Sequence, residues 1–204
     1  MEDINRSRNI ILKMLNLRNF ETDQYNNISD IELNILYEKK NLNFKVKHKT
    51  ENRFLYVKYL IDSNKNPNKS KFESILDSAF SENNDENYEL MFILPEDDKE
   101  NVLQNICNKY CDLYKKFSQV FYIKKITIDI TKHQNVPEHT LLTKDEENEL
   151  ISQYKINKKN LPYININDPV AKFLGIKKNQ IVKIIRPSIN AGETCLYRLC
   201  VNKY

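Results

Sequence analysis

The sequence contains no tryptophan, and its 204 residues include only two glycines and six prolines. Both glycines, Gly175 and Gly192, lie in the last third of the chain. A loop that cradles phosphate groups needs glycines where its backbone approaches the phosphates closely. Residues 1–135 contain no glycine, which excludes a phosphate-binding loop of this kind from that part of the chain.

Long apolar runs are also missing. No stretch of the sequence approaches the roughly 18 consecutive apolar residues that mark a membrane-spanning helix. The amino-terminal residues lack the basic region, apolar stretch and small-residue cleavage site of a secretory signal. We therefore expect an intracellular protein that has no membrane partner.

Cysteines are few, and their spacing argues against a metal or redox centre. The cysteines are Cys107, Cys111, Cys195 and Cys200, and neither close pair has the C-x-x-C spacing of zinc knuckles and redox motifs. Cys107 and Cys111 are spaced to share a helix face, but no nearby histidine or third cysteine completes a metal shell. We expect free structural thiols and predict neither a metal site nor a cofactor.

Charge is distributed unevenly along the chain. The 26 lysines, 28 asparagines and only 6 arginines indicate a nucleotide bias toward A and T. Residues 1–135 carry 21 basic and 21 acidic residues, whereas residues 136–204 carry 11 basic and 7 acidic ones, which accounts for the net charge of +4. The composition changes around Gln134–Pro137, which predicts a boundary between a domain over 1–135 and a second over 136–204.

Helix and strand patterns alternate in the first domain. The predicted helices cover 5–18, begin at the capping boxes Ser29–Glu32 and Ser70–Glu73, and run from Val102 to Phe117 after a cap at Asp97 or Asp98. Runs of aromatic and β-branched residues predict strands over 54–61, 90–94 and 120–131. Strands that alternate with helices through short connections indicate an α/β domain with a mainly parallel sheet covered by helices.

One motif in the first domain raises a nuclease hypothesis. Metal-dependent nucleases use an acid and a Glu-x-Lys pair on neighbouring strands to hold Mg²⁺ and to orient a water, and Glu38-Lys39-Lys40 has that spacing. The motif falls near the end of a predicted helix, however, and the strand over 54–61 carries Lys58 but no carboxylate. A solvated helix end is therefore the favoured interpretation.

The second domain reads as a small α+β unit. Thr143–Glu146 is a third capping box, and Leu161–Ile164 is typical of an edge strand. Asp168, Pro169 and Gly175 have the positions of the N-cap, the first residue and the C′ residue of a short helix. Two β-rich runs, 180–186 and 194–201, predict an antiparallel hairpin around a long loop over 187–193.

Several motifs in this second domain occur together and in order. They are Val136-Pro137-Glu138-His139, Leu161-Pro162, Asp168-Pro169-Val170-Ala171, Val182-Lys183-Ile184-Ile185-Arg186-Pro187-Ser188, Ala191-Gly192 and Tyr197-Arg198-Leu199. From Val136 to Cys200 the sequence closely resembles the carboxy-terminal domain of the fifth subunit shared by eukaryotic nuclear DNA-directed RNA polymerases. That domain is equivalent to a short subunit of the archaeal enzyme.

The first domain is similar to that family's amino-terminal jaw domain only in the segment Leu17–Phe20 and in the order of its elements. The archaeal counterpart is essentially the short domain alone, so a two-domain chain resembles the eukaryotic form or that of a large DNA virus with its own polymerase. The resemblance implies a nuclear location if the protein is cellular, and host cytoplasm or virion if it is viral.

The resemblance also implies a role. It predicts a non-catalytic subunit that docks on the largest polymerase subunit through its second domain, while the first forms part of the lower jaw near downstream duplex DNA. Other polymerase subunits and transcription factors are further expected partners. The partner-binding residues carried over from the matching motifs are Pro137, Glu138, His139, Asp168, Pro169, Arg186, Pro187, Ser188 and Arg198. We expect no catalytic residue of its own.

Some residues of the second domain support specific expectations. Its surplus of basic residues, including Lys158 and Arg186, suits an acidic patch on a partner. Arg186 and Arg198 are arginines in a lysine-rich chain, which suggests planar bidentate bonding. His139 is expected to bond to backbone or to a partner. Asn179 stands where the family usually has glycine, and we expect it to hold a positive φ.

Two other functions stay open from the sequence. One is a free-standing transcription regulator that reuses the assembly domain, and it would bind DNA without a polymerase. The other is the metal-dependent nuclease, whose activity would depend on Glu38.

Overall fold

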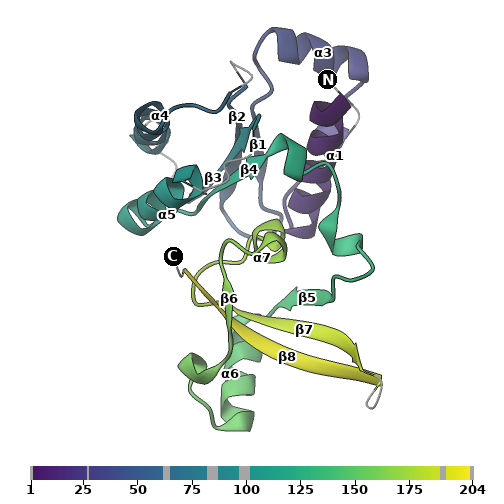
Figure 1. Cartoon of the computed structure of the whole chain (residues 1–204), viewed down its shortest axis with the longest axis vertical. Coiled ribbons are helices and arrows are strands. Elements are labelled where there is room, and N and C mark those ends of the chain that lie inside the picture. The colour runs from purple at the N-terminus through teal and green to yellow at the C-terminus, as the bar shows by residue number, and fades with distance from the viewer. Residues whose placement is uncertain are drawn as a thin grey trace. The chain divides into compact units, whose positions relative to one another are not determined.

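A computed structural model of the chain describes residues 2–26, 28–61, 65–81, 87–96, 102–188 and 192–202. In it the chain separates into two units, Met1–Ile128 and Asp129–Tyr204 (Figure 1). Residues 129–135, which the change in composition assigns to the first domain, lie in the second unit because η2 (Ile130–Lys132) packs against α7 (Pro169–Leu174).

The first unit is built around a four-stranded sheet. Its strands are β1 (Phe44–Lys47), β2 (Phe54–Tyr59), β3 (Tyr88–Leu94) and β4 (Ser118–Tyr122), in that order across the sheet. The pairs β2–β3 and β3–β4 are parallel, and β1 joins the edge antiparallel to β2. Helices α4 (Lys69–Ser81) and α5 (Val102–Tyr114) connect the parallel strands. The predicted mixed α/β character is thus confirmed.

Helices lie against both faces of this sheet. Figure 1 shows α4 and α5 on one side and α1 (Glu2–Leu17) on the other. All seven residues of β3 are buried, as expected for a central strand with helices over both faces. Two shorter helices, α2 (Asp23–Asn26) and α3 (Asp30–Glu38), lie between α1 and β1 in sequence, and the 3₁₀ turn η1 (Ile123–Lys125) follows β4.

The helix starts in the first unit follow the sequence prediction at one capping box and depart from it at the other. As predicted, the Ser29 hydroxyl accepts a hydrogen bond from the Glu32 amide, and the Ser29 amide donates one to the Glu32 carboxylate. The box at Ser70 is wrong, because α4 begins at Lys69 and Ser70 lies inside its first turn. The predicted caps Asp97 and Asp98 lie outside the described residues.

The predicted strand over 120–131 is too long, and the preceding helix ends before Phe117. Lys115 adopts a positive φ of 54° just after α5, which turns the chain toward β4. β4 ends at Tyr122, and the chain then forms η1 and η2. Asp129 stabilises η2 because its carboxylate accepts the Thr131 amide at 3.1 Å. Local capping therefore overrides the strand pattern beyond Tyr122.

The second unit holds a second four-stranded sheet and two helices. Its strands are β5 (Glu138–Leu141), β6 (Tyr163–Asn165), β7 (Ile181–Ser188) and β8 (Gly192–Val201), arranged β5-β7-β8-β6. All pairings are antiparallel except that of β6 with β8. The sheet packs against α6 (Lys144–Tyr154) and α7, and the turn η3 (Lys158–Asn160) follows α6.

The hairpin of the second unit is longer than predicted. β7 continues to Ser188 and β8 begins at Gly192, so Pro187 and Glu193 pair across the strands instead of lying in a long loop. Residues 189–191 lie outside the described residues. Asn179 has the expected positive φ, 70°. The described residues include no helix long and apolar enough to span a membrane.

Buried charges lie around Phe20 at the start of the parallel strands. Arg53 forms an ion pair with Glu89, which is only 5% exposed, and the Arg53 guanidinium also lies over the Phe20 ring. Burial lowers the pKa of Arg18 to about 10. His48 packs edge-on against Phe20, and its Nδ1 accepts the Glu51 amide at 3.1 Å. Burial and the neighbouring Arg53 lower the pKa of His48.

We predict that His48 makes the fold sensitive to acid. A depressed pKa means that the folded state favours neutral His48, so stability is complete above the unfolded value of about 6.5 and falls as pH drops through the folded value. His48→Asn keeps an acceptor near the Nδ1 position and does not titrate. The free energy of unfolding, measured between pH 7.5 and 5, should therefore fall less steeply for His48→Asn than for the natural chain. The two slopes should differ by at most about 1.4 kcal/mol per pH unit.

Nuclear magnetic resonance of the three histidine rings provides the direct check. The ring signal that disappears in His48→Asn should titrate below about 6.5 in the natural chain. A midpoint at or above that value would contradict the interpretation.

Candidate partner-binding site

Most of the predicted partner-binding residues lie on two neighbouring strands of the second unit. β5 pairs with β7 so that Glu138 faces Ile185 and His139 faces Ile184. Arg186, Pro187 and Ser188 continue β7 and pair with Thr194, Glu193 and Gly192 of β8. Pro137 directly precedes β5. The two motifs that begin at Val136 and at Val182 are thus brought side by side by strand pairing.

The register places these residues on two different faces of the sheet. Directly paired residues in an antiparallel sheet share a face, and successive residues of a strand alternate between faces. One face therefore presents four rows across β5, β7 and β8. The rows are Leu141, Val182 and Arg198; His139, Ile184 and Leu196; Arg186 with Thr194; and Ser188 with Gly192. Glu138 and Pro187 belong to the opposite face.

We call the outer residues of these rows, Leu141, His139, Arg186, Leu196 and Arg198, the hairpin face. Val182 and Ile184, in the middle of two rows, are buried in the core cluster that includes Ala171 of α7. Leu141 and Leu196 remain 37% and 36% exposed, respectively. Sequence reasoning missed both leucines because their exposure depends on the strand register, for which the individual runs give no signal.

The two arginines of the hairpin face differ in their contacts. Arg198 Nη1 donates to the Tyr163 carbonyl at 3.4 Å, a long contact with backbone instead of a paired contact with a carboxylate. Arg186 is exposed and has no hydrogen-bond or ion-pair partner within the described residues. The fold itself therefore gives no reason for a planar cation at position 186.

His139 Nδ1 lies 2.7 Å from the Pro137 carbonyl and acts as the donor in this contact. The histidine, which lies in β5, thus bonds to backbone, and this is one of the two expected arrangements. This bond leaves Nε2 as the ring nitrogen available to a partner.

Asp168 and Pro169 lie at the start of α7, whose Ala171 packs against Val182 and Ile184 between the outer residues of the hairpin face. The Asp168 carboxylate accepts the amides of Val170 at 2.9 Å and Ala171 at 3.2 Å, and Pro169 is the first residue of α7. Gly175 ends the helix with a φ of 68°. These contacts give Asp168 and Pro169 a role within the fold, because they start the helix that covers the sheet.

Glu147 is a structural residue that sequence reasoning missed. Its Oε1 accepts the Ile181 amide at 2.8 Å, and its Oε2 accepts from Lys158 Nζ at 2.7 Å. The carboxylate therefore joins α6 to the first residue of β7 and to η3. Lys158, counted above among the basic residues suited to a partner, is engaged within the unit instead.

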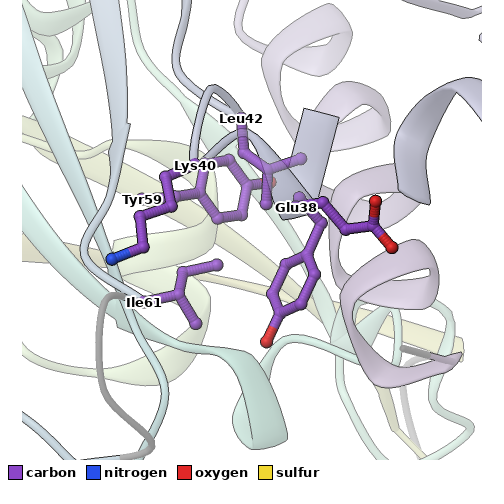
Figure 2. Close-up of a pocket in the computed structure, with 6 residues that line it drawn as sticks. Glu38, Lys40, Leu42, Tyr59 and Ile61 are labelled. Atoms are coloured by element: carbon purple, nitrogen blue, oxygen red, sulfur yellow. The ribbon is translucent and has the colours of Figure 1, made fainter. Parts of the chain in front are cut away.

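The first unit has a cavity of about 200 Å³ near the end of α3. Its lining residues are Tyr37, Glu38, Lys40, Leu42, Tyr59 and Ile61 (Figure 2). Glu38 and Lys40 of the nuclease hypothesis thus line one cavity, but at the end of a helix and not on adjacent strands. In the described part of the chain no three His, Cys, Asp or Glu residues are grouped to hold a metal ion. The structure adds no support to the nuclease hypothesis.

Comparison with known proteins agrees with the resemblance that the motifs indicate. Residues 128–200 match the model of the family described as RNA polymerase Rpb5, C-terminal domain. The predicted resemblance to the shared fifth polymerase subunit is confirmed. This Rpb5-like region contains the hairpin face, α6 and α7.

Individual relatives are subunits of DNA-directed RNA polymerases. Subunit rpabc1 of polymerases I, II and III from Dictyostelium discoideum is 49% identical over 77 residues, which are 38% of this chain and 39% of that protein. The RPABC1 subunits of Caenorhabditis briggsae and Caenorhabditis elegans are each 41% identical over 91 residues, 44% of this chain and 43% of theirs. The alignments thus span about two fifths of the curated relatives' length.

We predict that Glu147→Ala destabilises the Rpb5-like region by about 2 kcal/mol, since it removes a charge-assisted hydrogen bond and leaves the Ile181 amide without its acceptor. Glu149→Ala, on an exposed position of the same helix, is the matched control and should have little effect. Urea unfolding and hydrogen exchange at the Ile181 amide measure the change. Equal midpoints for the two variants would contradict the role of Glu147.

Proposed function

We propose that the chain is a non-catalytic subunit of a multisubunit DNA-directed RNA polymerase and that its Rpb5-like region docks on the largest subunit. The observation that carries this proposal is the match of residues 128–200 to the Rpb5 C-terminal domain. The named relatives are subunits of polymerases I, II and III. The order and number of matching motifs support an assembly role over a chance likeness in fold.

The hairpin face is the docking surface within this proposal. Leu141 and Leu196 provide exposed apolar area on either side of the buried Val182 and Ile184. Arg186 and Arg198 add hydrogen-bond donors, and His139 adds Nε2, which is an acceptor when Nδ1 carries the proton. Apolar residues at the centre of an interface supply most of the affinity, while charged residues at its rim select the partner. The partner surface should therefore present carboxylates around an apolar patch.

Arg186 is the residue of this face that is best suited to test the proposal. Its guanidinium is exposed and has no partner in the described part of the chain, so its removal leaves no buried group unsatisfied. An arginine carries five donors in a planar fork that matches a carboxylate. A loss of assembly without a loss of folding is therefore the expected signature.

The first unit would project toward downstream DNA as part of the polymerase jaw. Two lysines near β1 contact neutral groups of the unit: Lys45 Nζ lies 3.9 Å from the centre of the Phe54 ring, and Lys49 donates to Asn16. Equal numbers of basic and acidic residues in 1–135 also disfavour strong binding to free DNA. Contact with DNA would arise from tethering on the enzyme. The proposed location is the nucleus for a cellular protein, and host cytoplasm or virion for a viral one.

We predict that Arg186→Ala lowers incorporation into the polymerase by tenfold or more, a change of about 1.4 kcal/mol or more that is typical of an interface arginine. Tagged variants expressed in the native cell are purified, and the recovered largest subunit is measured per tagged chain. Lys159→Ala, an exposed cation on η3 outside the hairpin face, is the matched control and should assemble normally. Incorporation of Arg186→Lys should lie between that of Arg186→Ala and that of the control, because lysine keeps the positive charge but lacks the planar guanidinium.

Either of two results would refute the assignment of Arg186. One is normal incorporation of Arg186→Ala, and the other is unfolding of that variant in circular dichroism.

A further inference from the structure

Two cysteines of the first unit converge on one serine hydroxyl. Cys107 and Cys111 lie one turn apart on α5, and Ser118 is the first residue of β4. Ser118 Oγ lies 2.9 Å from Cys107 Sγ and 3.0 Å from Cys111 Sγ. The sequence spacing predicts that the two thiols share a helix face, but the hydroxyl between them appears only in the folded structure.

The backbone of Ser118 also contacts Cys111. Its amide donates to Cys111 Sγ at 3.1 Å, and its carbonyl lies 3.4 Å from the same sulfur. Cys111 Sγ is therefore positioned to accept two hydrogen bonds from Ser118, one from the amide and one from the hydroxyl. Hydrogen bonds donated to a sulfur favour its thiolate form.

The two thiols have different surroundings and therefore different roles. Cys107 is fully buried and Ser118 is 2% exposed, whereas Cys111 is partly exposed. Burial disfavours ionisation, so Cys107 keeps its proton and donates to Ser118 Oγ, whose hydroxyl donates in turn to Cys111. Each hydrogen bond in such a chain polarises the next.

The acidity of Cys111 agrees with this geometry. Hydrogen bonding from Cys107, with further bonds from Ser118, lowers the pKa of Cys111 to about 7, against the opposing effects of burial and of the nearby Asp112 carboxylate. Asp112 lies on α5 itself, and β4 contributes to this thiol through the uncharged Ser118. A large fraction of Cys111 is thus thiolate at neutral pH.

We propose that Cys111 is a thiol-modification site that reacts with disulfides of small thiols such as glutathione. The Cys111 thiolate attacks one sulfur of the small disulfide and forms a new sulfur–sulfur bond. The original bond breaks, and the second sulfur leaves with the electron pair and takes a proton from water. The products are one mixed disulfide at Cys111 and one free small thiol.

Cys107 supports this reaction as a hydrogen-bond donor and not as the second cysteine of a redox pair. Side chains four residues apart on a helix have Cβ atoms about 5–6 Å apart, whereas a disulfide needs about 3.5–4.5 Å. Closing a bond between Cys107 and Cys111 would require the last turn of α5 to unwind. The mixed disulfide at Cys111 is therefore retained, and it replaces the contacts that hold α5 to the start of β4.

The pH dependence of alkylation provides the test. The full chain is treated with iodoacetamide between pH 5.5 and 9.5, and the modified cysteines are identified by peptide mass spectrometry. The midpoint is measured in preference to a single rate, because burial and the weaker nucleophilicity of acidic thiolates both slow the reaction. Cys111 should have a midpoint of about 7, against about 8.5 for the same residue in the chain unfolded by guanidinium. Equal midpoints in the folded and unfolded chains would overturn the proposal.

Two variants of Cys107 test its role. Cys107→Ala removes the donor and should move the Cys111 midpoint toward about 8.5, whereas Cys107→Ser keeps a donor and should leave it near 7. If the Cys111 midpoint shifts equally in both variants, and circular dichroism shows that both are folded, the shift comes from altered packing. That result would overturn the proposed donation from Cys107 through Ser118 to Cys111.

Incubation with glutathione disulfide completes the test. The proposal predicts one glutathione at Cys111 and a Cys107 that alkylates only after unfolding. An internal Cys107–Cys111 disulfide without bound glutathione would refute the assigned roles.

Discussion

The pairing of β7 with both β5 and β8 is the constraint on which the Rpb5-like region depends. The register sets Leu141, Val182 and Arg198 in one row and His139, Ile184 and Leu196 in the next. A shift of one residue would move every side chain of a strand to the opposite face. It would take Val182 and Ile184 out of the core cluster that includes Ala171 of α7 and turn Lys183 toward that core instead. The same pairing therefore buries the core and assembles the exposed hairpin face.

The contacts that fix this register lie outside the hairpin face. Glu147 accepts the amide of Ile181 at the start of β7, and the Asp168 carboxylate starts the helix that covers the sheet. These carboxylates are engaged with backbone amides, which leaves the docking role to side chains that the fold does not need. Because the residues that stabilise the fold differ from those proposed to dock, an interface residue can change without loss of the fold. Exposed Arg186 can therefore be mutated to test docking alone.

The sequence predicted those elements whose signals are local. The capping boxes at Ser29 and Thr143 are present, and so is the short helix between Asp168 and Gly175, because a few neighbouring residues decide such ends. The box at Ser70 failed because α4 begins at Lys69, two residues before the start that an N-cap at Ser70 predicts. Contacts between distant segments were not predictable: Leu196 becomes part of the hairpin face only through the strand register, and Ser118 meets Cys111 only when β4 packs beside α5. The nine carried-over residues were found from family motifs, and their division between two faces and a helix start follows from the pairing.

The central proposal is that this chain is a stoichiometric subunit of a DNA-directed RNA polymerase. The most direct test is affinity purification of the tagged chain from its native cell in about 0.5 M salt, where contacts between exposed charges are strongly screened, followed by intact-complex mass spectrometry. The account predicts stoichiometric recovery with two very large polymerase subunits, whose identity would also name the polymerase. Recovery of the 24.3 kDa chain alone would contradict it and favour a free-standing regulator.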